Sequence, residues 1–171
     1  MGADRAILVE TAEAVSPLMT AKLFLALIQR EKPGLVILGK QGIDHDNNQT
    51  GQMLSALWDR PQATFASKLE INGETARVTR EVDAGLEVNE IDLPAVVTAD
   101  LRLNEPRYVK LPDIMKAKNK PLDVITRDKL VTAATADIQP VTYEAPTERE
   151  KGVMVEDVAG LVTALKDKGL L

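Results

Sequence analysis

The sequence contains no cysteine, a single histidine and few aromatic residues. Without cysteine the chain can form neither a disulfide nor a thiolate zinc site, and it has no cysteine nucleophile. His45 is the only histidine, so we expect no metal site. Aromatic residues make up 3% of the chain, which is too few for the base-stacking surfaces that bind single-stranded nucleic acid.

The sequence also has no net basic charge and no long apolar run. The formal net charge is -5, which argues against the nucleic-acid backbone as the main partner. No run approaches the roughly 20 apolar residues that cross a bilayer, and the first residues do not resemble a secretory signal. We therefore expect no membrane insertion, and a protein of the bacterial cytoplasm or, in a eukaryote, of the mitochondrial matrix.

The first forty residues predict a parallel strand-helix-strand unit. The chain has 171 residues, of which 44% are hydrophobic, as expected for one globular core. Residues 6–10 and 35–39 are short apolar runs, typical of strands that are buried on both faces. Between them, Ser16 can cap a helix that has Pro17 at its first position and ends near Lys32. A parallel sheet with right-handed connections follows from this order.

The middle of the chain changes to an alternating pattern. Apolar and polar residues alternate at 63–69, 77–82 and 86–93, and Asn72 with Gly73 is a hairpin signal. We predict an antiparallel meander that is added to the parallel sheet and leads to a buried strand at 95–99.

The last third has less regular structure until its end. Prolines interrupt residues 101–121, and a short helix is predicted at 113–118. An extended linker follows, with Pro140 and Pro146. The final helix is amphipathic and ends at Gly169. Its apolar residues have helical spacing and would pack on the chain's own core or on a partner subunit; they are Val158, Leu161, Val162 and Leu165.

The densest polar stretch follows the second predicted strand. Its two early glycines allow close approach of a ligand, and its lysine can neutralise a phosphate. It lies beyond the carboxyl end of a parallel strand and before a helix that Thr50 can cap, which is where such sheets bind ligands. The candidate nucleotide-binding residues are Gly39, Lys40, Gln41, Gly42, Ile43, Asp44, His45, Asp46, Asn47, Asn48, Gln49 and Thr50. A solvated loop without a ligand is the alternative.

Few side chains are arranged in a way that suggests acid-base chemistry. Asp44 and Asp46 flank His45, but no nucleophile or second metal ligand accompanies it, so an exposed histidine is the simpler interpretation. Glu81 and Asp83 lie two residues apart on one strand face, where a carboxylate pair could serve hydrolysis. We favour a structural or conformational role for Glu81, and we expect no catalytic residue.

A stretch near residue 110 has the character of a docking site. Leu111 is followed by Pro112 on what should be an exposed bend, and lysines surround it. One aliphatic side chain within a ring of charge is a common protein-docking anchor. Packing of Leu111 into the parent core is the alternative. The candidate docking residues are Leu111, Pro112, Ile114, Met115 and Lys116.

Several of these stretches, in order along nearly the whole chain, resemble the beta-subunit family of electron-transferring flavoproteins. They are residues 39–41, 49–53, 62–67, 80–83, 94–108 and 111–118. The resemblance implies a heterodimer with an alpha subunit that supplies most of an FAD site. It implies AMP bound by residues 39–50, and a recognition loop whose Leu111 enters a pocket on acyl-CoA dehydrogenases. Lys116 matches a lysine that is methylated in some relatives. Residues 1–5 match an internal point of the family, which implies an N-terminally incomplete chain.

The resemblance completes a set of expectations about fold and function. The expected fold class is α/β: a Rossmann-like parallel sheet of the adenine nucleotide alpha hydrolase type, with an added antiparallel meander and a C-terminal helical arm. Residues 1–120 would form the nucleotide-binding domain, which lacks its first strand-helix-strand portion and includes the recognition loop 101–118. Residues 121–171 would form a linker and an arm on the partner subunit. Electrons would pass from acyl-CoA and related flavin dehydrogenases toward a quinone oxidoreductase. A stand-alone adenine-nucleotide sensor and an ATP-dependent ligase-type enzyme are the alternatives.

Overall fold

The computed structural model describes residues 2–12, 14–131, 141–149 and 151–171. They belong to two units, one within Met1–Ile138 and the other within Gln139–Leu171. The first unit combines parallel strands, an antiparallel meander and helices, and the second carries a C-terminal helix, so the expected α/β class is confirmed.

A small sheet pairs the first strand of the chain with the last strand. β1 (Ala6–Glu10) is parallel to β7 (Leu122–Thr126), with Leu8 opposite Val124. β7 lies in a stretch that was predicted as linker. Within the described residues β1 has one neighbouring strand, and Leu8 is 46% exposed. The prediction that β1 is buried on both faces was therefore wrong.

The larger sheet has the order β2-β6-β3-β4-β5. Its strands are β2 (Leu35–Gly39), β3 (Gln62–Asn72), β4 (Thr75–Val82), β5 (Gly85–Asp92) and β6 (Ala95–Ala99). β2 and β3 flank β6 and are parallel to it, while β3, β4 and β5 form the predicted antiparallel meander. A bulge lets β3 pair with β6 in its first half and with β4 in its second.

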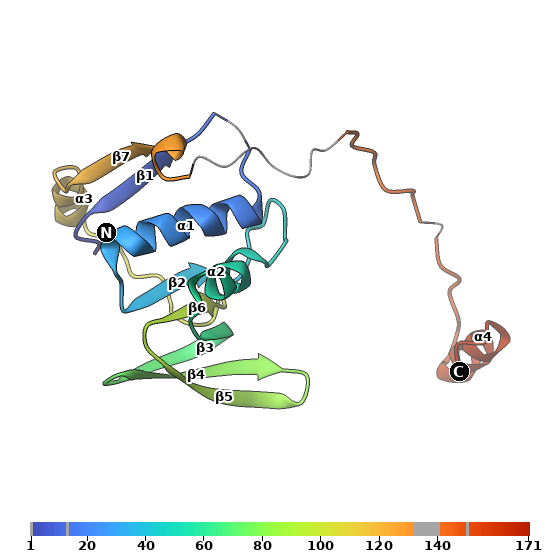
Figure 1. Cartoon of the computed structure of the whole chain (residues 1–171). Helices are drawn as coiled ribbons and strands as arrows, with labels where there is room; N and C mark the ends of the chain where they lie inside the picture. The colour runs from blue at the N-terminus through green and yellow to red at the C-terminus, as the bar shows by residue number, and fades with distance from the viewer. Residues whose placement is uncertain (1, 13, 132–140, 150) are drawn as a thin grey trace. The chain divides into compact units, whose positions relative to one another are not determined.

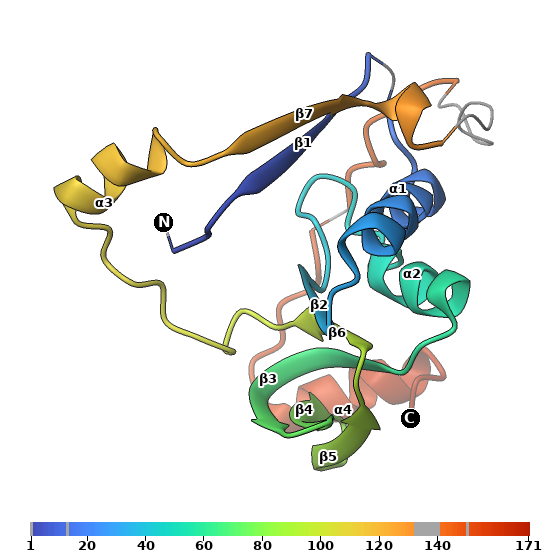
Figure 2. The same cartoon turned by 60° about the vertical axis from the view of Figure 1, so that its left-hand side comes forward.

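Two expectations for the larger sheet need correction. β2 is an edge strand among the described residues, and Ile37 is 51% exposed, so β2 is not buried on both faces. β1 and β2 lie in separate sheets, and the strand-helix-strand unit therefore does not share one sheet here (Figures 1 and 2). β6 is the buried strand that its sequence predicts; four of its five residues are buried and Ala99 is partly exposed.

Two helices cover one face of the larger sheet. α1 (Pro17–Glu31) and α2 (Thr50–Trp58) lie side by side (Figure 1). Ser16 caps α1 as predicted, because its Oγ accepts a hydrogen bond from the Met19 amide at 3.2 Å. Lys32 ends the helix in the left-handed conformation, with φ of 49°. The two helices and β6 form a first core cluster. Its buried residues are Ala21, Ile28, Leu54 and Val96.

A second core cluster lies on the opposite face of β6. Val96 and Val97 are consecutive strand residues, so their side chains point to opposite faces. Val97 packs with residues of β3 and β4 as the meander curls over this side (Figure 2). The buried members of the cluster are Ala63, Ala66, Val78 and Val97. The two clusters together bury β6, whose carboxyl end leads into the candidate site.

The chain between β6 and β7 carries one short helix. α3 (Leu111–Ala117) begins two residues earlier than the predicted 113–118, because Pro112 fits the first turn of a helix. Leu111 is therefore the first residue of a helix rather than part of a bend. After β7, a 3-10 helix spans Arg127–Lys129.

The second unit contains α4 (Val158–Asp167), which confirms the predicted amphipathic helix. The Asp157 Oδ1 caps it by accepting a hydrogen bond from the Gly160 amide at 2.7 Å. Gly169 follows the helix with φ of 66°, as a helix stop requires. No residue of α4 is buried; Leu161 is 46% exposed and Val162 is 37% exposed.

Candidate functional site

The polar loop lies between β2 and α2, at the carboxyl ends of the parallel strands β2 and β6. Its first residue is fixed to the sheet, because the Lys40 amide donates to the Ala99 carbonyl at 3.0 Å. The loop closes on itself where the Asp46 amide donates to the Gly42 carbonyl at 2.9 Å. Asp46 and Asn48 have φ of 52° and 50°, conformations that Asp and Asn adopt more readily than most residues. The predicted position of the loop, after a parallel strand and before a helix, is confirmed.

The loop ends at a helix N-terminus that has no side-chain cap. Thr50 was predicted to cap α2, but the cap position is held by Gln49, and Thr50 is the first helical residue. Within the described chain the amides of Thr50, Gly51 and Gln52 have no acceptor, and Met53 is the first to donate backward, to the Gln49 carbonyl at 3.0 Å. An uncapped helix N-terminus of this kind can donate to an anion.

Gly51 lets α2 approach β6 closely. A Cβ at this position would lie 2.3 Å from the Cγ2 of Thr98, so only glycine fits without a shift. The Thr98 hydroxyl in turn accepts a hydrogen bond from the Phe65 amide at 3.2 Å. Phe65 has φ of 59°, which is uncommon for an aromatic residue and coincides with the bulge of β3.

Most of the loop is exposed. The Nδ1 of His45 lies 2.9 Å from the Oδ2 of Asp44, and this hydrogen bond lowers the pKa of the Asp44 carboxyl below its usual value. Gln41 donates to the Asp46 carboxylate. Over the described parts of the chain, no group of three or more acidic or imidazole side chains is placed to hold a metal ion. His45 is thus an exposed histidine with one acidic neighbour.

Lys40 is bound by the buried carboxylate of Asp100. Its Nζ donates to the Oδ2 of Asp100 at 3.0 Å and lies 5.5 Å from the centre of the Phe65 ring. The Asp100 carboxylate also accepts from Arg102, at 3.0 Å from the Nε and 3.1 Å from the amide. Hydrogen bonds from Lys40 and then Arg102 lower the pKa of Asp100 to about 2. Lys40 is therefore already partly neutralised, and an incoming phosphate would share it with Asp100.

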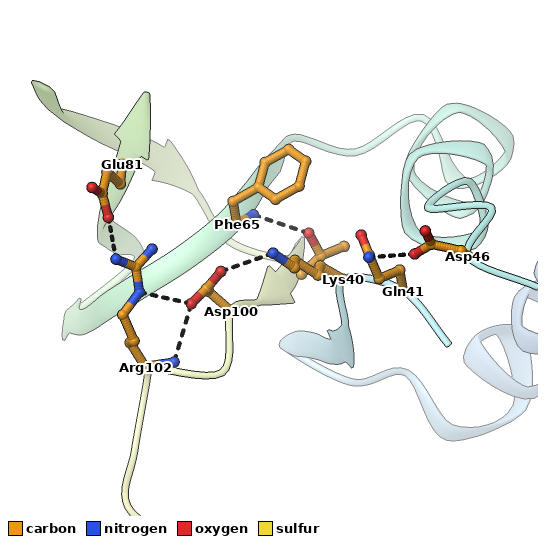
Figure 3. A network of polar contacts seen from close by, with 8 residues as sticks. Lys40, Gln41, Asp46, Phe65, Glu81, Asp100 and Arg102 are labelled. Carbon is orange, nitrogen blue, oxygen red and sulfur yellow. Dashed lines mark hydrogen bonds and ion pairs between the residues drawn. The ribbon is translucent and has the colours of Figure 1, made fainter. Parts of the chain in front are cut away.

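Glu81 is tied to the same group of charges. Its carboxylate pairs with Arg102, whose guanidinium therefore bridges Glu81 and Asp100 (Figure 3). The hydrogen bonds that Arg102 donates to Asp100 and then to Glu81 raise the pKa of its guanidinium. Asp83 lies in the turn between β4 and β5, and the possible carboxylate pair with Glu81 is not assembled. Glu81, 52% exposed at its side chain, remains accessible to a partner.

The structure thus brings together residues that are distant in sequence. Lys40 and Glu81, both identified from the sequence, are joined through two residues that were not, Asp100 and Arg102 (Figure 3). Asp100 is the one charged residue among those buried in the described chain. A charge that directly follows a buried, mostly apolar strand was the available signal, because such a residue stays at the sheet end and needs partners there.

The candidate docking residues form the exposed helix α3. Leu111 is 71% exposed and Met115, one turn later, is 55% exposed, while Ile114 is half-buried. The alternative in which Leu111 packs into the core is therefore wrong for this structure. Residues four apart lie on one helix face, so Leu111 and Met115 form a small apolar surface, with Lys116 exposed beside it.

A parallel sheet with a polar loop leading to an uncapped helix N-terminus is the arrangement of nucleotide-binding α/β proteins. Residues 1–130 match the model of the electron transfer flavoprotein domain. The beta subunit of electron transfer flavoprotein from Bradyrhizobium diazoefficiens is 53% identical over 98% of this chain and 68% of its own length. The beta subunit from Dictyostelium discoideum is 50% identical over 100% of this chain and 68% of its own.

A further relative, the mitochondrial beta subunit from Arabidopsis thaliana, is 51% identical over 98% of this chain and 68% of its own length. This chain therefore belongs to the beta-subunit family of electron transfer flavoproteins. No helix in the described ranges has the length and apolar character needed to cross a membrane.

Proposed function

We propose that this chain is the beta subunit of an electron carrier, and that an alpha subunit completes it. In this proposal FAD lies at the interface with the alpha subunit, AMP is bound structurally by the polar loop, and the chain itself performs no covalent chemistry. The carrier accepts electrons from acyl-CoA and related flavin dehydrogenases and delivers them to a quinone oxidoreductase. The proposal is supported most directly by the match of nearly the whole of this chain to beta subunits, at 49–53% identity.

An exposed leucine on a short helix supports the docking part of the proposal. Leu111 and Met115 offer a small apolar surface, and Lys110 and Lys116 lie beside it. A carrier has to dissociate after each electron transfer, so a small buried area suits it, while the lysines raise the association rate with an acidic partner surface.

The docking role can be tested with Leu111→Ala. We expect the rate of carrier reduction by acyl-CoA dehydrogenase to fall at least several-fold, with unchanged FAD content, because the variant loses the apolar anchor and keeps the flavin site. Leu86→Ala is the matched control, since Leu86 is 74% exposed on β5 and Leu111 is 71% exposed. Unchanged kinetics for the Leu111 variant, or an equal loss in both variants, would refute the docking role.

The polar loop and the N-terminus of α2 support nucleotide binding. The amides of Thr50 and Gly51 are directed into the loop region without a protein acceptor in the described chain, and Lys40 adds positive charge next to them. Residues 39–50 would hold the AMP phosphate and ribose. Denatured heterodimer should release AMP in a ratio of about one to one. Release of a second FAD in place of AMP would contradict this assignment and would indicate an electron-bifurcating relative.

The heterodimer itself is the most basic expectation. We propose that the apolar side of α4 packs on the alpha subunit, and that Glu81 takes part in a conformational change of the complex. Because Leu122–Thr126 pairs with β1, the proposed arm is limited to the second unit, within Gln139–Leu171, and does not begin at residue 121. A location in the bacterial cytoplasm or the mitochondrial matrix also belongs to this proposal. Co-expression with an alpha subunit should give a yellow complex. A colourless chain that binds ATP or AMP alone would favour a nucleotide sensor, and pyrophosphate release from ATP would favour a ligase-type enzyme.

A further inference from the structure

Asp100 occupies the point where the docking segment, residues 101–117 with α3 at its end, leaves the larger sheet. It directly follows β6 and is 8% exposed. Its amide donates to the Ala66 carbonyl at 2.9 Å, which fixes its backbone to β3. Its two carboxylate oxygens bind different groups: Oδ2 accepts from Lys40, and Oδ1 accepts twice from Arg102.

The bonds to Arg102 set the direction of the chain after β6. The Arg102 amide donates to the Asp100 side chain two residues earlier at 3.1 Å, the pattern of an Asx turn. The Leu103 amide donates to the Asp100 carbonyl at 3.2 Å, and Leu103 packs on the second core cluster. Arg102 then joins Glu81 on β4. Residues 101–103 are thus held by several contacts, and three of these are hydrogen bonds that Arg102 and Leu103 donate to Asp100.

The rest of the segment has few contacts of its own. Between residues 104 and 109 the described chain makes no hydrogen bond to the rest of the protein, and these residues are exposed. The segment then forms α3, whose own first turn closes where the Lys110 carbonyl accepts from the amides of Asp113 and Ile114 at 2.9 Å and 3.2 Å. After α3 the chain is fixed again, because Lys120 donates to the Ala3 carbonyl and the Ala6 amide donates to the Pro121 carbonyl at 3.0 Å. The place of Leu111 is therefore set from two ends, by the turn that begins at Asp100 and by the pairing of β7 with β1.

We propose that Asp100 is a positioning residue for partner docking, which acts through Arg102 and the turn after β6 to place the apolar surface of α3. The inference rests on the proposed docking function of Leu111. Asp100 itself is buried, so it acts in this proposal through the residues that it binds. Because its Oδ1 bonds form a turn, an amide oxygen can replace a carboxylate oxygen there, whereas a methyl group cannot.

The test measures steady-state reduction of the co-expressed heterodimer by acyl-CoA dehydrogenase. Asp100→Ala is expected to raise KM for the carrier about three- to tenfold, with kcat and FAD content unchanged, because misplaced docking weakens encounter and leaves the flavin intact. Asp100→Asn should recover most of that change, since its Oδ1 still accepts from the Arg102 amide. Asp92→Asn, at an exposed carboxylate at the end of β5, is the matched control and should leave KM unchanged.

A double-mutant cycle separates positioning from general damage. If Asp100 acts through Leu111, Asp100→Ala should have no further effect on KM in a Leu111→Ala background. Multiplied effects of the two substitutions would overturn the inference, as would equal KM values for the Ala and Asn variants at position 100. If Asp100→Ala fails to fold, Arg102→Ala takes its place in the cycle, since the Arg102 side chain is half-exposed. Arg102→Ala should then raise KM in the natural background and have no further effect on KM in the Leu111→Ala background. A silent Leu111→Ala with normal FAD content would instead refute the proposed docking function.

Discussion

Replacing Gly51 by alanine tests the close packing of α2 against β6. Alanine is normally better than glycine inside a helix by about 1 kcal/mol. Here the added Cβ would lie 2.3 Å from the Cγ2 of Thr98, well inside the usual carbon-carbon contact distance. Overpacking of a core typically costs about 1–3 kcal/mol, and a contact this short belongs near the upper end. The net expected loss of folding free energy is about 2 kcal/mol.

A second substitution can remove the clash without removing the hydrogen bond at the same site. Thr98→Ser deletes the Cγ2 and keeps the hydroxyl that accepts from the Phe65 amide at 3.2 Å. The nearest atom to the new Cβ is then the Cδ1 of Leu38 at 3.4 Å, an ordinary contact. In the serine background, Gly51→Ala should therefore be neutral or stabilising by up to about 1 kcal/mol.

Thermal unfolding of the four proteins measures the effect. For a chain of this size, 1 kcal/mol corresponds to about 2–4 °C in Tm, so Gly51→Ala should lower Tm by about 4–8 °C in the natural background. In the serine background it should leave Tm unchanged or raise it slightly. A similar fall in both backgrounds would refute the steric argument, and so would a higher Tm for the single Gly51 variant.

Other predictions concern the helix cap, the core and the charge network. Ser16→Ala should cost about 1 kcal/mol, since the Met19 amide loses its acceptor, and urea denaturation can measure this. Leu54→Ala should cost about 2–5 kcal/mol by the same assay, because Leu54 is completely buried. The pKa of Asp100 is lowered from 3.8 to about 2, so its ionised form adds stability above pH 4, and that stability is lost as pH falls toward 2. The Tm difference between the natural protein and Asp100→Asn should accordingly shrink over this interval, and a constant difference would contradict the role of the charge.

The sequence predicted local structure well where one segment determines it alone. Ser16 and Pro17 define the start of α1, and the alternating residues of the meander define β3, β4 and β5, because these signals depend only on near neighbours. Gly169 likewise predicted the end of α4. The location of the polar loop followed from the order of strand, loop and helix.

Features that depend on distant contacts were predicted less well. The apolar runs of β1 and β2 suggested burial on both faces, but burial depends on how many neighbours a strand has, which the run does not encode. β7 was missed because its five residues follow an irregular stretch and are stabilised by pairing with β1. Thr50 is a good capping residue by type, yet Gln49 holds the cap position because the path of the loop decides it.

The candidate site shows the same division. Lys40 and Glu81 could be identified as isolated charged residues, but nothing in their sequence neighbourhoods indicates that Asp100 and Arg102 join them. The pairing requires β2, β4 and β6 to be assembled in one sheet first. The exposure of Leu111 was one of two open alternatives, and the fold decided between them.

The route of the chain between its two sheets has a mechanical consequence. In the described residues the backbone crosses from one sheet to the other twice, once through α1 and once through the span that carries α3. A molecule that binds α3 therefore binds one of the two segments that connect the sheets. A force applied at Leu111 would be transmitted to both β6 and β7. A partner bound at Leu111 would therefore limit how far the two sheets can move apart.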